Sequence, residues 1–346
     1  MRNAEDASRS VPHTLNAGAT SMWNRPSACF GGVRSTTCIP SHPARGHRSR
    51  WTLALSIVLL CSCARPTPSG AQVDPALSIL IPPDTVIAAA VHLDKLRQTP
   101  VYEKYLANRS IPQIDRMARF TGIDPRKDLW QLLYVSDAKH NVLLGRGDFA
   151  GDMESKLERE GAQRFGYKSY YMIGSEEAAV VFFNSTTAAV GNLDSLRALL
   201  DSRGKSSGPP PAMAERMKDI PAEAQVWAVY IGGPIKVPFE LPGNLANVNN
   251  LLTAVHRASL YFDLREGVRG MLRALSDSEL NAKSVHDALK AAVGFGRLMS
   301  PQDQPDLLRV YDGLQVSQAG TRVDVKIEEP PDLVEKFLNL GLGRVR

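Results

Sequence analysis

A serine in a glycine-rich stretch is the first residue pattern that could do chemistry. Residues 204–208 read Gly-Lys-Ser-Ser-Gly. This is the spacing of a hydrolase nucleophile, in which the central serine attacks an ester or amide from a tight strand-to-helix turn. Three prolines at 209–211 follow directly, and proline disrupts the hydrogen bonding of a helix. We therefore predict a flexible linker here and no nucleophile at Ser206.

Carboxylates and imidazoles could bind a metal ion or move protons. Asp124 and Asp128 could form a metal pair, but the glycine and proline around them predict a turn in which these carboxylates cap backbone groups. The histidines beyond residue 63 have no spacing that would bring two of them to one zinc ion; they are His92, His140, His256 and His286. We predict no metal site and no cofactor.

Two enzyme hypotheses remain as alternatives. Glu154, Glu158 and Glu160 could supply a carboxylate pair, although their alternation with basic residues is typical of a solvated helix face. The other alternative is an active site assembled from dispersed residues, such as Asp124, Asp128, His92 and His140. No convergent catalytic motif supports either one, so we expect a non-enzymatic protein.

Five aromatic residues are concentrated on neighbouring predicted strands. Packing in the core is the simpler explanation for them. If helices leave one face of the sheet open, these rings could instead line an apolar groove in which tyrosine hydroxyls orient a ligand. The candidate groove residues are Tyr167, Tyr170, Tyr171, Phe182 and Phe183.

Cys63 is the one residue for which we predict a covalent modification. Residues 45–50 carry three arginines, residues 51–60 are an apolar run, and Cys-Ser-Cys follows at 61–63. This order is that of a signal peptide. The uncharged stretch from Trp51 to Ala64 is too short to cross a bilayer core of about 30 Å.

Leu60-Cys61-Ser62-Cys63 resembles the lipobox of bacterial lipoproteins. The resemblance implies that cleavage makes Cys63 the new N-terminus and that acyl chains on it anchor the protein to a membrane. Several chains on one cysteine give stable anchoring. Ala64 follows the cysteine, which implies the outer membrane if the host is Gram-negative. An ordinary secretory signal and an uncleaved signal anchor are the alternatives.

The basic charge of the chain is confined to the leader. Seven of the 41 basic residues and two of the 36 acidic residues precede Ala64, so 34 of each remain. A neutral domain without a basic cluster does not fit a nucleic-acid-binding protein. All four cysteines also lie at or before position 63, so the domain has no disulfide.

Composition and periodicity predict an α+β fold of mostly antiparallel sheets with helices on one face, in two similar halves. We expect an unstructured extension or over-called start at 1–44, a lipoprotein signal peptide at 45–62 and a tether at 63–76. The first half then spans 77–201, a linker 202–213 and the second half 214–346. Both halves end with a strand, a turn, a strand and a short helix, which suggests a duplication.

Three short segments resemble a family of bacterial cell-envelope proteins classed as a domain of unknown function. They are Ile81–Thr85, which reads Ile-Pro-Pro-Asp-Thr, the Thr-Gly-Ile-Asp-Pro turn that opens Thr121–Leu129, and Gly145–Phe149. The likeness covers about residues 78 to 232 and implies a fold but no reaction. Taken together, the sequence predicts an envelope lipoprotein that binds a partner protein or ligand, with carriage of a lipid or other hydrophobic ligand as the alternative.

Overall fold

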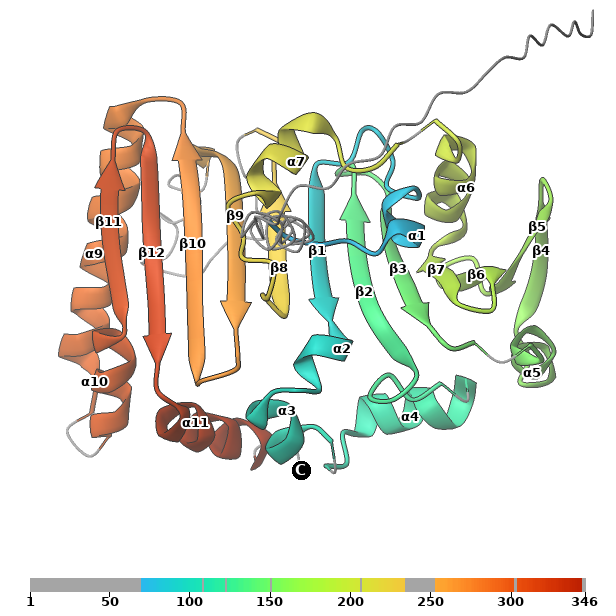
Figure 1. Cartoon of the computed structure of the whole chain (residues 1–346), viewed down its shortest axis with the longest axis horizontal. Coiled ribbons are helices and arrows are strands. Elements are labelled where there is room, and N and C mark those ends of the chain that lie inside the picture. Colours follow the sequence, from blue (N-terminus) through green and yellow to red (C-terminus); the bar gives the residue numbers. More distant parts are fainter. Residues whose placement is uncertain are drawn as a thin grey trace, which may run out of the picture. The chain divides into compact units, whose positions relative to one another are not determined.

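One twelve-stranded antiparallel sheet forms the frame of the domain (Figure 1). The computed structural model describes residues 70–346, except for 108, 122, 150, 206, 234–252, 302–303 and 344–346. The signal peptide, Cys63 and most of the tether therefore lie outside the described residues, as does most of 245–254, where the apolar pattern predicts a helix. The described residues belong to one compact unit, Pro66–Arg346.

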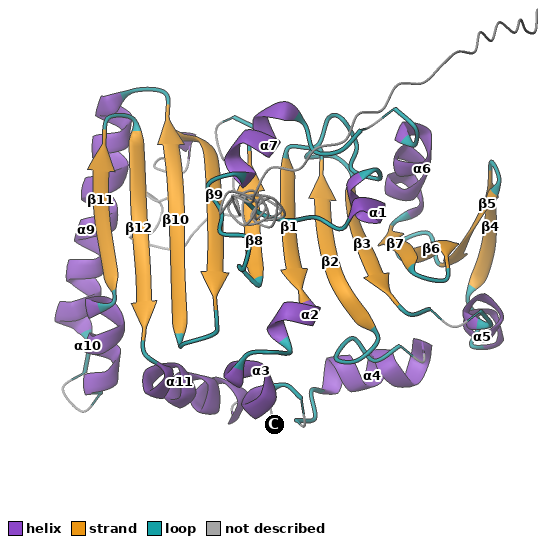
Figure 2. Cartoon of the chain, viewed as in Figure 1, coloured by secondary structure: helices purple, strands orange, loops and turns teal. Residues whose placement is uncertain are grey.

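The strands, coloured orange in Figure 2, have the order β11-β12-β10-β9-β8-β1-β2-β3-β7-β6-β5-β4 across the sheet. Their bounds are β1 Ile87–His92, β2 Leu129–Ser136, β3 Asn141–Gly147, β4 Gln163–Tyr167, β5 Tyr170–Gly174, β6 Ala179–Asn184, β7 Thr187–Gly191, β8 Val226–Tyr230, β9 Val255–Asp263, β10 Val268–Ser276, β11 Leu314–Ala319 and β12 Arg322–Glu329.

The described helices are α1 Pro75–Ser78, α2 Leu93–Leu96, α3 Pro100–Tyr105, α4 Pro112–Thr121, α5 Met153–Arg159, α6 Leu193–Ser202, α7 Pro211–Met217, α9 Glu279–Met299, α10 Pro305–Asp312 and α11 Pro331–Gly343. Several begin at capping residues. Asn192 accepts a hydrogen bond from the backbone N–H of Ser195 at 2.8 Å and starts α6, and Ser278 accepts one from Asn281 and starts α9. Such caps satisfy N–H groups that a helix leaves open.

The two halves have the same strand order. Outward from the centre, the first half runs β1-β2-β3-β7-β6 and the second runs β8-β9-β10-β12-β11, with β1 and β8 paired antiparallel in the middle. The β4–β5 hairpin extends the first half at its edge. The predicted α+β fold, its antiparallel pairing and its two similar halves are confirmed.

Apolar residues occupy both faces of the sheet. Face A carries Ala90, which pairs with Leu133 and Trp227, and α1, α6 and α7 pack on this face in the main hydrophobic cluster. Face B is the opposite face. There Ala274 pairs with Ala258 and packs against α9.

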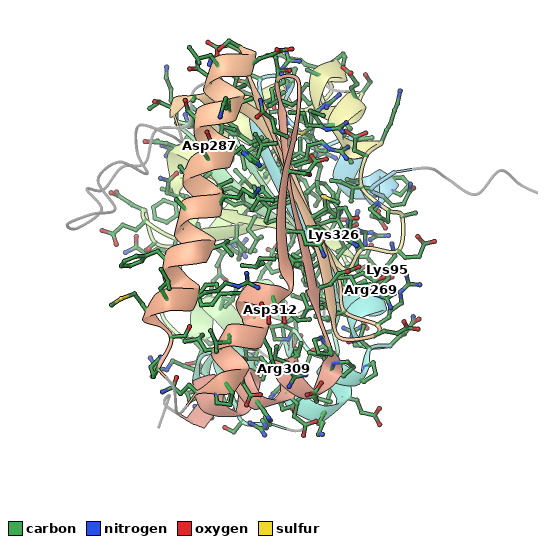
Figure 3. The ribbon with its side chains drawn as sticks, turned by 90° about the vertical axis from the view of Figure 1, so that its left-hand side faces the viewer. Lys95, Arg269, Asp287, Arg309, Asp312 and Lys326 are labelled. Carbon is green, nitrogen blue, oxygen red and sulfur yellow. The ribbon has the colours of Figure 1, made fainter. Side chains whose placement is uncertain are left out.

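The helices therefore divide between two faces, whereas we expected them on one. Figure 3 shows α9 on one side of the sheet seen edge-on. The physical reason is that strands such as β6 are apolar at consecutive positions, so both of their faces need cover. Helix α7 also begins inside the predicted linker. Its first residue is Pro211, and proline fits the first turn of a helix because no backbone N–H is needed there.

Candidate ligand-binding cleft

An apolar cleft of about 460 Å³ lies on face B, between α5 and the strands β5, β6 and β7. This volume is within the range of small-molecule sites in proteins. Its lining consists of apolar side chains with a few polar residues at the rim. The main lining residues are Ile123, Met153, Leu157, Ala162, Ile173, Ala178, Val180, Phe182 and Val190.

Strand alternation places the floor of the cleft. Val180 pairs with Ile173 on one side and with Val190 on the other, so the three side chains share a face. The neighbouring Val181 points to face A and is fully buried there. Val180 is only half-buried and Val190 is 43% exposed. Floor residues of the cleft thus remain accessible.

Helix α5 forms one wall, and its shortness leaves the cleft open. Met153 and Leu157 are four residues apart, so both project from one side of the helix. They are buried in a small cluster with Phe149 and Ile173. The helix has only seven residues, about 10 Å of length, and so covers only part of this face.

The polar groups of the cleft do not form a catalytic arrangement. Glu160 and Ser175 belong to the lining and are both exposed. Phe182 packs edge-to-face on Phe149, with 5.6 Å between the ring centroids. The site can therefore hold an apolar group and present one carboxylate and one hydroxyl at its mouth.

The five predicted groove residues do not share one groove. Phe182 lines the cleft, and Tyr171 is 53% exposed with the Arg164 guanidinium 4.6 Å from its ring centroid. Tyr170 and Phe183 pack edge-to-face at 5.7 Å and lie against the main cluster of face A.

Tyr167 also packs against face A. Its hydroxyl donates to Asp201 in α6 at 3.0 Å, and this hydrogen bond to a carboxylate raises the pKa of the Tyr167 phenol. Arg203 lies 5.0 Å from the ring centroids of both Tyr170 and Phe183. Tyr167, Tyr170 and Phe183 are therefore partly buried rings at the edge of the face A core, in contact with Asp201 and Arg203.

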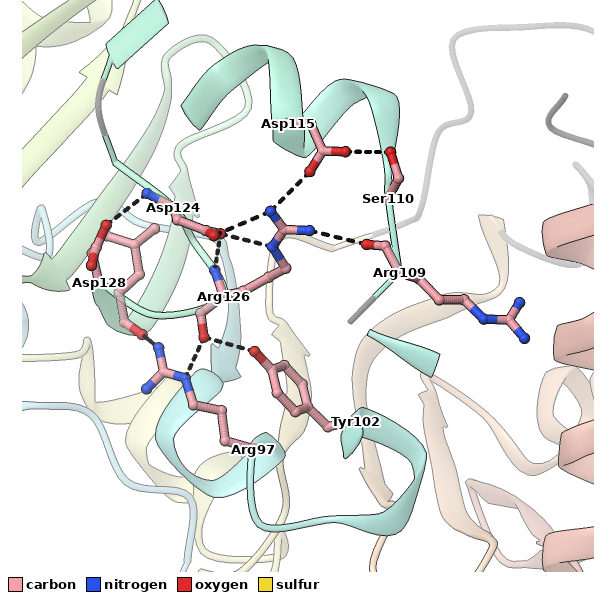
Figure 4. Close-up of polar contacts among 9 residues, drawn as sticks. Arg97, Tyr102, Arg109, Ser110, Asp115, Asp124, Arg126 and Asp128 are labelled. Atoms are coloured by element: carbon pink, nitrogen blue, oxygen red, sulfur yellow. Dashed lines mark hydrogen bonds and ion pairs between the residues drawn. The ribbon is translucent and has the colours of Figure 1, made fainter. Parts of the chain in front are cut away.

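Asp124 and Asp128 act as turn residues (Figure 4). Asp128 Oδ2 accepts from the backbone N–H of Asp124 at 2.7 Å, and Asp124 forms an ion pair with Arg126 at 2.8 Å. The hydrogen bond that the Arg126 side chain donates to the Asp124 carboxylate lowers the pKa of Asp124. No cluster of three or more metal-binding side chains exists among the residues that the structure describes.

His92 and His140 lie at opposite ends of β2. His92 pairs with Gln131 near the start of the strand, whereas His140 sits in the hairpin turn after Ser136, where its Nδ1 is 2.8 Å from Asp137 Oδ2. The dispersed residues of the enzyme alternative thus do not come together. His92 is buried, and burial lowers its pKa from 6.5 to about 4.

The other candidates have structural roles or are not described. Glu154 and Glu158 both form ion pairs with Arg164 on the surface. Ser206 lies outside the described residues. No described helix is both long enough and apolar enough to cross a membrane.

Most of the cleft residues cannot be told from core residues in the sequence. Ile173, Val180 and Val190 appear in the sequence as ordinary strand residues, and only their register shows that they share a face. The available signal was the apolar run of β6, which predicts burial on both faces, beside a helix too short to cover one of them.

Comparisons with protein-family models and with curated proteins give no match. Among solved structures, crystal form I of TP0453 is similar with a TM-score of 0.43 and 12% identity over 78% of this chain and 98% of that one. Crystal form III gives a TM-score of 0.46 and 11% identity over 78% and 99%. The likeness to an envelope family of unknown function stays a prediction.

Proposed function

We propose that the protein is a non-enzymatic envelope lipoprotein, anchored through acylated Cys63, whose domain binds a hydrophobic ligand such as a lipid acyl chain. The observation that carries the ligand proposal is the apolar cleft on face B. The anchor rests on the sequence around Cys63. The two parts fit together, since a protein tethered to a bilayer is held close to lipids.

The chemistry of the cleft favours binding over catalysis. Ile173, Val180 and Phe182 offer dispersion contacts and exclude water, and an alkyl chain gains about 0.8 kcal/mol for each methylene that leaves water. Glu160 and Ser175 at the rim could orient a polar end group, such as a hydroxyl or an amine. A free carboxylate end group would meet the charge of Glu160, so an uncharged or cationic head fits better.

A photoreactive lipid tests the ligand proposal. The protein, extracted from membranes and reconstituted in phosphatidylethanolamine vesicles, would be irradiated with an alkyl amine that carries a diazirine in its chain. We expect adducts on the peptides that contain Met153–Leu157 and Ala178–Phe182. Adducts spread evenly over the surface would contradict the proposal.

A matched pair of variants gives the control. Ala178 is exposed and lines the cleft, so Ala178→Trp would fill it and reduce adduct formation about tenfold, the effect of about 1.4 kcal/mol. Ala319 is also exposed and ends β11, far from the cleft in sheet order. Ala319→Trp should leave adduct formation unchanged.

Mass spectrometry tests the anchor separately. We expect the membrane-extracted protein to begin at Cys63 and to carry acyl mass on it, and we expect a Cys63→Ala variant to lack that mass. An unmodified or longer N-terminus in the parent protein would refute the anchor and leave the cleft to be judged by its own experiment.

A further inference from the structure

One corner of the molecule exposes several large apolar side chains from three helices. On α9, Phe295 is 61%, Leu298 85% and Met299 66% exposed. Leu308 of α10 and Phe337 of α11 are also exposed, and α10 contacts both α9 and α11. We call these five residues the apolar corner.

Helix periodicity separates the apolar corner from the face of α9 that packs on the sheet. Ala282 and Val285 are buried against β10 and β12. At 100° per residue, Phe295 and Leu298 are on the opposite side of the helix, together with Ala291. Helix α9 is therefore apolar on two sides: Ala282 and Val285 pack on the sheet near its start, and Phe295 and Leu298 face outward near its end.

Basic residues border the outward stripe. Lys283, Lys290 and Arg297 are seven residues apart along α9, so they lie in one row beside the stripe. Lys283 pairs with Asp287 and Arg297 with Asp312. These pairs are exposed, and exposed ion pairs are weak and screened, so Arg297, which lies beside Leu298, can exchange to a lipid phosphate.

The apolar corner lies at the same end of the sheet as the root of the tether. Gln131 donates to the backbone oxygen of Gln72 at 3.3 Å. The neighbouring Leu132 starts a row of paired residues that crosses the sheet to Leu314, two residues after α10 ends. Figure 1 shows α10 and α11 together at that end of the strands.

The tether is long enough for Cys63 to lie in a bilayer at this end of the sheet. Six strand spacings of about 4.8 Å place Leu132 and Leu314 about 29 Å apart within the sheet, and the tether root lies over face A whereas α9 lies over face B. The nine residues from Cys63 to Gln72 reach at most about 32 Å. A bilayer at this end of the domain can therefore hold acyl chains on Cys63 and contact α9 and α10 at once.

We propose that the apolar corner docks on the surface of a lipid bilayer, with Phe295, Leu298 and Met299 inserted among the acyl chains and Arg297 at the phosphates. The choice of a bilayer rests on the proposed lipid anchor. A second copy of the chain fits less well, because a stable protein interface uses roughly 20 residues a side and the apolar corner has five.

Site-specific photocrosslinking of the membrane-extracted protein tests this docking. The photoreactive amino acid p-benzoylphenylalanine would replace Leu298 in one sample and Ser284, exposed on the same helix, in a matched control. Each would be reconstituted in vesicles of phosphatidylglycerol and phosphatidylethanolamine in equal parts. We expect lipid adducts at 298 and about tenfold fewer at 284. Equal yields at the two positions, no adduct at 298, or a crosslink at 298 to a second copy of the chain would overturn the proposal.

A charge-insertion variant provides the second measurement. With the photoreactive residue at position 308 on α10, Phe295→Glu together with Leu298→Glu should reduce lipid adducts about tenfold, because carboxylates oppose insertion beside anionic lipids. Leu280→Glu is the control, since Leu280 is 74% exposed at the other end of α9, and should change little. An unchanged yield in the double variant contradicts the docking.

The same samples separate this inference from the proposed function. Mass spectrometry of each sample reads acylation at Cys63, and lipid adducts at 298 in a protein without acyl mass would refute the anchor but support the docking. Acylated protein without adducts at 298 would support the anchor but refute the docking. Ala178→Trp, which fills the cleft, should leave the adducts at 298 unchanged.

Discussion

The indole N–H of Trp227 donates to Nε2 of His92 over 3.3 Å. Trp227 belongs to β8 and His92 ends β1, so this contact joins the first strands of the two halves at the centre of the sheet. Gln131 Nε2 lies 3.4 Å from the same nitrogen. Because Nε2 accepts, the neutral imidazole carries its proton on Nδ1, and a protonated ring would lose the Trp227 contact.

The free energy of unfolding should decrease as the pH is lowered, because the unfolded chain then takes up a proton on His92 that the native protein does not. The pKa of His92 is about 4 in the folded protein, because burial disfavours the charged ring, and 6.5 in an unfolded chain. Between these values the unfolded chain binds a proton that the native protein does not. This contribution to the free energy of unfolding is complete above about pH 6.5 and is lost towards pH 4, by up to about 3 kcal/mol. Urea unfolding from about pH 7 to about pH 4 measures it.

A variant that cannot titrate isolates this effect. His92→Gln keeps an oxygen that can accept from Trp227, so its stability should depend less on pH over the same range. His286 lies on the outer helix α9, next to Asp287, and His286→Gln should retain the parental slope. If His92→Gln also retained it, another group would be responsible.

Arg126 ties the loop before β2 to the start of α4, and its loss should loosen that region. Its side chain is 2.8 Å from Asp115, 2.8 Å from Asp124 and 3.0 Å from the carbonyl oxygen of Arg109. Arg126→Ala should lower the free energy of unfolding by about 1–2 kcal/mol, since three acceptors lose their partner. Faster amide hydrogen exchange in α4 would locate the effect. Lys127 is exposed, so Lys127→Ala should change stability by less than about 0.5 kcal/mol.

Chelators should not affect the stability of the domain. Asp124 and Asp128 are the two carboxylates that could have formed a metal pair. Instead, Asp124 pairs with Arg126, and Asp128 accepts a hydrogen bond from the backbone N–H of Asp124. Calcium, magnesium or EDTA should therefore leave the melting temperature within about 1 °C, because only ligands that bind the native state raise it. A rise of several degrees with one cation would reveal a site that the described residues do not show.

The sequence predicted the elements well where periodicity or turn chemistry was strong. The sequence predicts strands at 132–135 and 141–146 and helices at 193–201 and 278–298, and β2, β3, α6 and the long α9 have nearly these bounds. Strand β4 was missed because its residues are mostly exposed and include Gly166, which removes the alternating pattern that marks a half-buried strand. Helix α7 was not predicted because three consecutive prolines indicate a linker. The last of them, Pro211, is instead the first residue of the helix, where proline is favourable.

The cleft could not be predicted from the sequence, because it depends on which neighbours share a face. The aromatic residues at 167–183 correctly indicated strands that border the cleft. Because side chains alternate along a strand, however, Tyr170 and Phe183 lie on face A and Phe182 lies on face B. Val180 and Val190 meet only through pairing of β6 with β7. A single sequence does not give the register that decides this.

Gly267 and Gly161 both have a positive φ, but a Cβ would overlap another atom only at Gly267. Gly267, in the β9–β10 turn, has a φ of +88°, and a Cβ there would lie 2.2 Å from the carbonyl oxygen of Glu329. Gly161 has a φ of +95° and nothing within 4 Å of its Cβ position. Gly161→Ala should cost about 1 kcal/mol from strain alone, whereas Gly267→Ala adds overlap with a fixed backbone atom and should cost at least about 3 kcal/mol. Urea unfolding of the two variants measures the difference, and equal losses would show that the β12 end moves aside.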